Sequence, residues 1–359
     1  MNIAIIGLAN AGKTTVFGAL TGRHVEITTY PSTSGDPQVG TVKVPDARLE
    51  RLCEFFKPKK TTHAAVEYID FIGLTKGDAK QNRKVFDLVK DADAIVQVVR
   101  LFADDAVTHP LERVNAARDI QTVELELIFG DLEFIEKRLA RMEDEVKRGR
   151  KPDELERKVL VKCRDTLLKE IPLRTIAFTE EELQGMRHLQ FLSTIPEIVV
   201  LNHGEEDIGN TGVKQLIEEL KGQYHPIPLL PLCGKIEMEI AQLPEADRKI
   251  FLDDMGLHEP AAHKLIHACY DLLGLISFFT YAGEEVRAWT IKRGTPAQKA
   301  AGKVHSDMER GFIRAEVISF DELISAGDIH TARAKGLMRL EGKAYEIRDG
   351  DVINFRFNV

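Results

Sequence analysis

The chain has 359 residues, of which 43% are hydrophobic and 30% are charged, a composition typical of a globular protein with two or three domains. Its net charge of −8 excludes attraction of the whole surface to nucleic acid or to an anionic membrane, so a nucleic-acid contact needs a local basic patch. Its four cysteines form no CxxC pair, which excludes a zinc site or a disulfide scaffold. No basic leader precedes the first strand and no apolar run reaches the ~20 residues of a membrane helix, so we expect a cytoplasmic protein with neither membrane nor DNA as partner.

A buried parallel sheet is predicted by five short runs of β-branched and aliphatic residues. These runs cover residues 2–6, 65–69, 94–99, 198–201 and 227–232. An alternating run at 39–44 adds a strand at the sheet edge. Helical patterns lie between the runs, and this alternation is typical of an α/β fold with a doubly wound, mostly parallel sheet.

A helical hairpin interrupts this alternation. Its first helix is indicated by apolar residues spaced three and four apart, namely Leu125, Ile128, Leu132, Ile135, Leu139, Met142 and Val146. Gly149 and Pro152 break the pattern, and a second helix follows with apolar residues Leu155, Val159, Cys163 and Leu167. Two helices joined by so short a breaker are predicted to pack antiparallel.

Four segments follow from these patterns. Short strands and turn signals after about residue 275 indicate a small, separate α+β domain. We therefore expect a first part of the sheet domain, the hairpin insertion, a second part of the sheet domain and a C-terminal domain, with bounds 1–121, 122–190, 191–275 and 276–359.

A phosphate-binding loop is indicated by GLANAGKTT at residues 7–15, which matches the Walker A pattern between a strand and a helix. Glycines let backbone N–H groups approach phosphate oxygens, and the following helix points its positive end at them. Lys13 is expected to act electrostatically on the β- and γ-phosphates, and the Thr14 hydroxyl to ligate Mg²⁺. The nucleotide contacts predicted here are Asn10, Ala11, Gly12, Lys13, Thr14 and Thr15.

A magnesium and γ-phosphate site is predicted at DFIG, which ends the strand at 65–69. Asp70 is expected to hold Mg²⁺ through water, and the Gly73 N–H to sense the γ-phosphate. A DxxG pattern alone is common, but behind a Walker A motif it becomes strong support for a nucleotide hydrolase.

The base-binding residues are expected at Asn202-His203-Gly204-Glu205, where guanine-specific sites usually have Asn-Lys-x-Asp. The longer Glu205 displaces the carboxylate that would pair with guanine N1–H and N2–H, so we expect ATP to be favoured over GTP. Cys233 and Gly234, at the end of the next strand, are expected to support the base. Two alternatives stay open: Asn202 only caps a helix, or Glu205 still reaches guanine and the protein is a GTPase.

These motifs resemble the YchF / Obg-like ATPase family of the Obg-related P-loop class, and the resemblance covers almost the whole chain. The family has GLPNVGKST where this chain has GLANAGKTT, and a base motif of the type NxxE. The segments 285–317 and DGDVINFRFNV are similar to the family's C-terminal TGS domain, a β-grasp fold. The resemblance implies ATP hydrolysis with Mg²⁺, and association with ribosomes.

Two departures indicate a divergent member. In the first switch, YPSTSGDPQVG places Ser34 where the family has a magnesium-binding Thr, with Thr33 beside it, and either hydroxyl could ligate Mg²⁺. In the second switch, GLTKGDAKQNRKVF is shorter than the family's GLVKGASKGEGLGNKF and lacks most of its glycines, so its motion or its effect on hydrolysis is expected to differ.

The residue that orients the attacking water is unknown from the sequence. Ras-type enzymes use a Gln directly after DxxG, where this chain has the apolar Leu74. Hydrolysis is therefore expected to be slow without a partner. Asn10 is a candidate K⁺ ligand, with the bound cation acting like an arginine finger, and the alternative that Asn10 only stabilises the loop stays open.

A basic run at the hairpin turn is a candidate contact for ribosomal RNA, and consists of Lys147, Arg148, Arg150 and Lys151. The alternative is an ordinary solvated turn. The function predicted is an Mg²⁺-dependent ATPase that switches on ribosomes or the translation machinery. The alternatives are a GTPase, or a nucleotide-gated ribosome- or RNA-binding module with negligible hydrolysis.

Overall fold

The computed structural model describes residues 1–22, 37–282 and 284–358, and the chain divides into two compact units. The first comprises residues 1–40 and 67–262, and the second residues 41–66 and 263–359. In the described residues the strands form two six-stranded sheets.

The first sheet has the strand order β2-β4-β1-β5-β6-β7. Its strands are β1 (Asn2–Ile6), β2 (Gln38–Lys43), β4 (Ala65–Asp70), β5 (Ala94–Arg100), β6 (Glu197–Asn202) and β7 (Leu229–Leu232). β1 pairs in parallel with β4 and β5, β5 with β6, and β6 with β7. The predicted parallel strands are confirmed, and β2 lies at the edge as expected.

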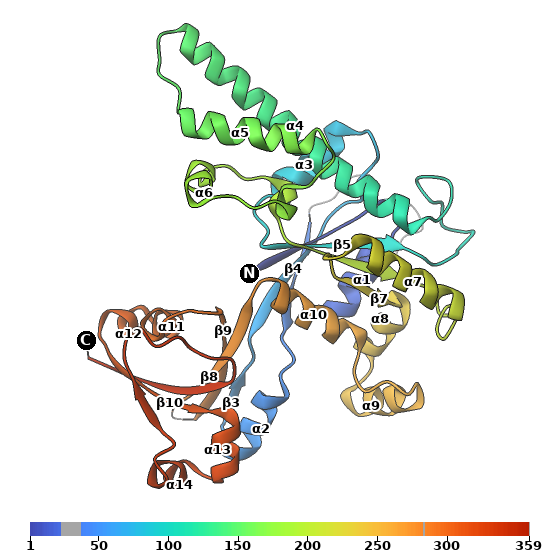
Figure 1. Ribbon diagram of the computed structural model, residues 1–359. Coiled ribbons are helices and arrows are strands. Elements are labelled where there is room, and N and C mark those ends of the chain that lie inside the picture. The colour runs from blue at the N-terminus through green and yellow to red at the C-terminus, as the bar shows by residue number, and fades with distance from the viewer. Residues whose placement is uncertain (23–36, 283, 359) are drawn as a thin grey trace. The chain divides into compact units, whose positions relative to one another are not determined.

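Helices cover this sheet on both faces. They are α1 (Lys13–Thr21), α3 (Ala79–Val89), α4 (Ala116–Lys147), α7 (Thr211–Tyr224) and α8 (Gly234–Gln242). α9 (Glu245–Asp254) follows α8 and contacts it. Apolar clusters join β1 and β5 to α3 and α4, and join β5 and β6 to α4 and α7. α1 and α8 pack against each other below the sheet in the view of Figure 1. Because β4, β1, β5, β6 and β7 are parallel, their carboxyl ends lie at the same edge of the sheet, which is where ligands bind in sheets of this kind.

The hairpin consists of α4 and α5 (Glu154–Leu167), which lie side by side and run in opposite directions (Figure 1). The predicted seam is confirmed where Ile128, Ile135 and Met142 are buried in one cluster with Val159 and other residues of α5, whereas Val146, near the turn, is 49% exposed. The shorter helices η1 (Leu173–Thr175), α6 (Glu180–Met186) and η2 (Leu192–Thr194) follow.

The long helix α4 begins at Ala116, before the predicted insertion. The Asn115 side chain accepts a hydrogen bond from the Arg118 N–H at 3.0 Å and so caps the helix. Consequently one uninterrupted helix of 32 residues joins the sheet domain to the hairpin turn.

The second unit has the strand order β11-β10-β12-β8-β9-β3. Its strands are β3 (Lys60–Thr62), β8 (Leu275–Ala282), β9 (Glu285–Lys292), β10 (Phe312–Ser319), β11 (Arg339–Glu341) and β12 (Asp351–Phe357). Its helices are α2 (Ala47–Phe56), α10 (Ala261–Leu272), α11 (Ala297–Val304), α12 (Ser306–Arg310), α13 (Phe320–Ala326) and α14 (Ile329–Ala334).

The structure places residues 41–66 with this second unit, whereas the sequence analysis assigned them to the sheet domain. β3 adds a parallel edge strand to β9, the Phe56 ring stacks on Tyr281 at 4.6 Å, and Arg48 pairs with Asp349 at 2.8 Å.

Across the described residues, no helix has both the length and the apolar character needed to cross a membrane.

Candidate nucleotide-binding site

The loop between β1 and α1 has no room for side chains at two glycines. A Cβ atom at Gly7 (φ 147°) would lie 2.3 Å from the Val98 carbonyl oxygen, and one at Gly12 (φ 90°) would lie 2.1 Å from Asn202 Nδ2. Both φ angles also favour glycine. The loop therefore has the backbone conformation of a phosphate-binding loop, as the Walker A pattern predicts.

Lys13 is buried beneath this loop. It is 7% exposed, and its Nζ donates a hydrogen bond to the Leu8 carbonyl oxygen at 3.0 Å. Burial lowers the pKa of Lys13 from 10.5 to about 8, and the nearby charge of Asp70 opposes this shift. An anionic phosphate group close to Nζ would favour the charged ammonium and so reverse the effect of burial.

Thr14 and Asp70 are brought together from different elements. The Thr14 hydroxyl donates to Asp70 Oδ2 at 2.8 Å, while Asp70 Oδ1 is buried and has no hydrogen-bond partner among the residues that the structure describes. Burial raises the pKa of Asp70 above its usual value. A hydroxyl and a carboxylate oxygen are ligands that Mg²⁺ prefers, and the unpaired Oδ1 fits a metal-bound water.

A magnesium ion held here would depend on ligands from beyond the protein side chains. Among the described residues no three His, Cys, Asp or Glu side chains gather in a way that could hold a metal ion. Mg²⁺ usually keeps several waters and binds substrate phosphates with one or two protein ligands, so a site with only Thr14 and Asp70 from the protein would agree with this preference. The predicted ligand Ser34 lies outside the described residues.

The DxxG segment contacts the phosphate-binding loop directly. A Cβ atom at Gly73 would lie 2.6 Å from Ala9 Cα, so only glycine fits at this point. The Leu74 N–H donates to the Gly7 carbonyl oxygen at 2.9 Å. The segment expected to sense the γ-phosphate is therefore held against the loop expected to bind it.

The second switch is fixed by two buried side chains that the sequence analysis did not select, Asn82 of α3 and Glu126 of α4. Asn82 is fully buried, accepts from the Thr75 N–H at 3.0 Å, and donates to the Thr75 carbonyl at 2.8 Å and to Glu126 Oε2 at 2.7 Å. Glu126 Oε1 accepts from the Gly77 N–H at 2.8 Å. The turn 75–77 is thus attached to the long hairpin helix.

A sequence signal for Asn82 exists in α3. Asn82, Val85 and Val89 are spaced three and four residues apart, and all three are buried. A polar residue in an apolar stripe needs a hydrogen-bond partner once it is buried. The identity of that partner, 44 residues away on another helix, has no signal in a single sequence.

Asn10 attaches the phosphate-binding loop to the segment between β5 and α4. It adopts φ 60°, and its Nδ2 donates to the Thr108 carbonyl oxygen at 2.9 Å. The next residue, His109, is buried and bonded to Asp119 at 2.9 Å, and its Nδ1 accepts from the Leu111 N–H at 3.0 Å. These contacts support a loop-stabilising role for Asn10, and the role as a K⁺ ligand stays a prediction.

Asn202 links the phosphate-binding loop to the end of the next strand. Its Nδ2 donates to the Ala11 carbonyl oxygen at 3.1 Å, and its Oδ1 accepts from the Gly234 N–H at 3.0 Å. The helix that follows β6 is capped by Asn210, but the Gly234 N–H that Asn202 accepts belongs to the first residue of α8, so the alternative that Asn202 only caps a helix stays open. Asn202 therefore sets the distance between the predicted phosphate and base contacts.

The remaining predicted base contacts differ in exposure. Cys233 is buried, and burial raises the pKa of its thiol, which disfavours a reactive thiolate. His203 Nδ1 lies 2.9 Å from the Gly204 carbonyl oxygen. Glu205 Oε1 lies 2.8 Å from Lys235 Nζ, and these two side chains are 45% and 67% exposed. The sequence analysis did not select Lys235.

The basic residues at the hairpin turn are all exposed, and they are Lys147, Arg148, Arg150 and Lys151. Lys147 Nζ pairs with Asp144 at 3.1 Å, and Gly149 adopts φ 78° in the turn. The turn lies at the far end of α4 from the nucleotide site (Figure 1), so these residues form a separate candidate surface.

Comparisons with known proteins find relatives that match this chain over its full length or nearly so. Residues 275–358 match the family YchF-GTPase_C, described as a protein of unknown function (DUF933), and residues 2–129 match the family MMR_HSR1, described as a 50S ribosome-binding GTPase. The chain is 41% identical to the Ribosome-binding ATPase YchF of Bacillus subtilis over all of both chains, and 38% identical to that of Escherichia coli O157:H7 over 99% of this chain and 98% of the relative. The structure of the Schizosaccharomyces pombe YchF GTPase superposes with a TM-score of 0.83 at 27% identity, over 99% and 97% of the two chains.

Proposed function

Because the chain belongs to the YchF family, we propose that it is an Mg²⁺-dependent ATPase that prefers ATP to GTP and acts as a nucleotide-dependent switch on ribosomes. The observation that carries this proposal is the joint burial of Lys13 and Asp70 beneath a glycine-rich loop, with Thr14 bonded to Asp70. The ribosome as partner is taken from the names of the relatives, and it implies a cytoplasmic protein.

The phosphates are bound by the loop at residues 7–15. Its backbone N–H groups and the Lys13 ammonium contact phosphate oxygens, and Thr14 and Asp70 hold Mg²⁺. When bound, Mg²⁺ supplies positive charge that neutralises the β- and γ-phosphates. The Gly73 N–H responds to the γ-phosphate, and the turn 75–77 transmits that response to α4 through Glu126.

The position after DxxG does not supply a side chain that could orient the attacking water. Leu74 offers no polar atom to orient the attacking water, so the rate of hydrolysis by the isolated protein is low and a partner increases it. We also propose that K⁺ bound at Asn10 accelerates turnover. Single-turnover rates in K⁺ and in Na⁺ buffers test this point, and equal rates would dismiss it.

A fluorescent-nucleotide titration with competing ATP and GTP tests the proposed preference. Tighter binding of ATP is expected because Glu205 is one methylene longer than the aspartate of guanine-specific sites. Tighter binding of GTP would favour the GTPase alternative. Single-turnover hydrolysis with and without ribosomes distinguishes both from a nucleotide-gated binding module, which would bind ATP and leave it intact.

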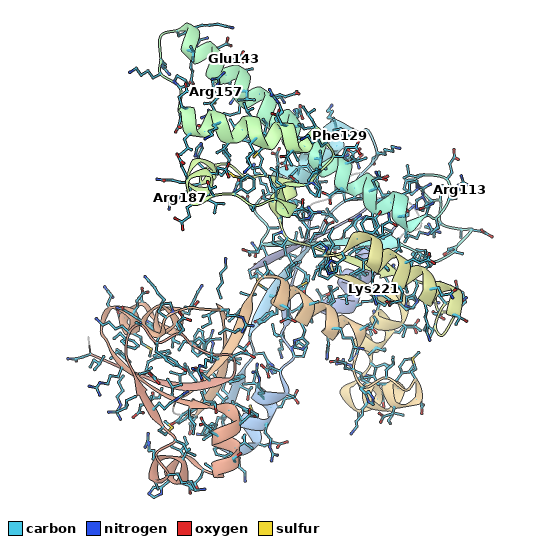
Figure 2. All side chains as sticks on the ribbon, in the orientation of Figure 1. Arg113, Phe129, Glu143, Arg157, Arg187 and Lys221 are labelled. Atoms are coloured by element: carbon cyan, nitrogen blue, oxygen red, sulfur yellow. The ribbon has the colours of Figure 1, made fainter. Side chains whose placement is uncertain are left out.

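The basic turn is proposed as the contact with ribosomal RNA. Charge reversal of Arg148 and Arg150 is expected to weaken co-sedimentation with ribosomes. With two arginines fewer at the turn, binding would release fewer counterions from the RNA phosphates, and the affinity would fall. Arg157 on α5, labelled in Figure 2, provides the matched control, since it is an exposed hairpin arginine outside the turn. An equal loss per reversed arginine with Arg157→Glu would indicate a general charge effect in place of a contact at the turn. Residues 276–359, which lie in the second unit, are proposed to form the TGS domain of β-grasp fold.

A further inference from the structure

Two buried glutamates share one arginine where the hairpin helix α4 meets the sheet. Glu124 lies on α4, Glu197 is the first residue of β6, and Arg174 comes from η1. The Nη2 atom of Arg174 donates to one oxygen of each carboxylate, Glu124 Oε2 and Glu197 Oε2. The side chains of Glu197, Arg174 and Glu124 are 1%, 9% and 16% exposed, so water has little access to this cluster.

The hydrogen bonding of this cluster is incomplete. Glu124 Oε1, Glu197 Oε1 and Arg174 Nε are buried, and within the described part of the chain none of them has a hydrogen-bond partner. Buried polar groups are usually paired, and an unpaired one costs free energy, more so when it carries a charge. The second carboxylate therefore lacks both a cation of its own and a donor for its remaining oxygen.

The surrounding charges do not compensate this second carboxylate. Among the described residues, the charged groups that act on Glu124 and Glu197 are Arg174 and, two turns further along α4, Asp131. Asp131 is itself a buried carboxylate, and it adds negative charge. Cys163 of α5 lies near Asp131 and is neutral, because burial raises the pKa of its thiol to about 12. With both glutamates ionised, the cluster would hold an uncompensated negative charge away from water, which is unfavourable.

From this geometry we propose that Glu124 and Glu197 form a proton-binding site: in mildly acidic solution the folded protein keeps one proton on the pair, and loss of that proton weakens the attachment of α4 to β6. With one proton bound, a single carboxylate faces the single guanidinium, and one unpaired acceptor becomes a donor. Because two carboxylates on one nitrogen titrate together, the proton belongs to the pair.

The direction of the pH effect follows from the titration of the pair. Burial, and next the charge of Glu197, raise the pKa of Glu124 from 4.5 to about 7, and burial raises the pKa of Glu197 as well. A glutamate of the unfolded chain loses its proton near pH 4.5, whereas the folded pair keeps one up to about pH 7. The stabilisation by this proton is therefore complete below pH 4.5, decreases between pH 4.5 and 7, and is absent above pH 7.

Amide hydrogen exchange in peptides from α4 and β6 tests this inference, because it reports local opening of these elements. Glu124→Gln keeps the shape of a protonated glutamate and cannot lose the proton. The exchange rate of the wild type divided by that of the variant, at equal pH, is expected to rise by up to about tenfold per pH unit between pH 5 and 7 and to level off above pH 7. Glu197→Gln is expected to give the same profile, since either variant leaves one carboxylate for Arg174.

The matched control is Glu133→Gln, on the same helix. Hydrogen bonds from Arg83 and then Lys137 lower the pKa of Glu133, so this residue is ionised throughout the tested range and its rate ratio is expected to stay flat. A ratio for Glu124→Gln that is equally flat would overturn the inference.

Infrared difference spectroscopy provides a second measurement, which needs no stable variant. The wild type is expected to lose the C=O band of a buried protonated carboxyl group between pH 5 and 8, and Glu124→Gln or Glu197→Gln should lack this change. A wild type without such a band would overturn the inference, as would a band that persists in both variants.

Discussion

The two ends of the nucleotide site differ in how far water reaches them. At the phosphate end, meaning residues 7–15 with Asp70, Lys13 and Asp70 are each 7% exposed. At the base end, meaning residues 202–205 and 233–235, the side chains of Glu205 and Lys235 are 45% and 67% exposed. Because charges interact more strongly where water is excluded, substitutions at the phosphate end are expected to change the free energy of catalysis, whereas those at the base end are expected to alter selectivity at little cost to stability.

The largest effect is expected from Lys13→Ala. Removal of the buried ammonium is predicted to lower the single-turnover rate of ATP hydrolysis by about 10²–10³-fold, the usual loss when a preorganised group that stabilises transition-state charge is removed. Quenched-flow measurement of phosphate release gives this rate. A loss below tenfold would contradict the assignment of the catalytic charge to the phosphate end.

Asn82→Ala tests the buried hydrogen bonds that attach the second switch to α4. The variant leaves Thr75 and Glu126 with unpaired buried groups, so the free energy of unfolding is predicted to fall by about 2–3 kcal/mol. Urea unfolding followed by fluorescence gives this value. Gln81→Ala is the control, since the side chain of this half-buried neighbour makes one hydrogen bond within the described part of the chain, to the Gly73 carbonyl at 3.2 Å. Equal losses for both variants would show that Asn82 has no special role.

Asp70→Asn is predicted to raise the Mg²⁺ concentration for half-maximal hydrolysis by about 10- to 100-fold, the usual cost of losing a carboxylate that orients a metal's water ligands. A magnesium titration of the single-turnover rate measures the change. Glu205→Gln, at the base end, is expected to leave the magnesium requirement unchanged. A shift of similar size in both variants would remove the distinction between the two ends.

The pH dependence of nucleotide affinity gives the smallest expected effect. The pKa of Lys13 is lowered from 10.5 to about 8 in the free protein, so Lys13 is mostly charged below pH 8 and mostly neutral above it. Bound phosphates favour the charged form, so binding above pH 8 takes up a proton. Affinity is therefore predicted to fall as pH rises above 8, by at most about tenfold per unit. Calorimetry in buffers of different ionisation enthalpy measures the proton uptake, and Glu205→Ala should retain it.

The sheet and the phosphate end are predictable because local sequence determines them. The strands are short apolar runs, and the bounds of β1 are predicted without error. The Walker A pattern specifies a backbone conformation at Gly7 and Gly12 that needs no distant partner. The hairpin is predictable for a similar reason, since its seam repeats along one helix.

The contacts that were not predicted join residues far apart in the sequence. β3 is a polar strand of three residues, and only its pairing with β9, more than 220 residues later, gives it a place in a sheet. Asn82 gives a weak signal on an apolar stripe, but Glu126 gives none. Glu205 and Lys235 are two among many exposed charges until the parallel pairing of β6 and β7 brings them together.

The length of α4 determines how far the hairpin turn moves when the helix rotates at its other end. Glu126 and the basic turn at Lys147 lie on one rod, and 21 residues at about 1.5 Å each separate them by ~32 Å. A rotation of roughly 5° about the Glu126 end would displace the turn by ~3 Å, which is about the length of a hydrogen bond. Because Glu126 is bonded to the second switch, a small angular change of α4 at that end would displace the turn far enough to make or break contacts there.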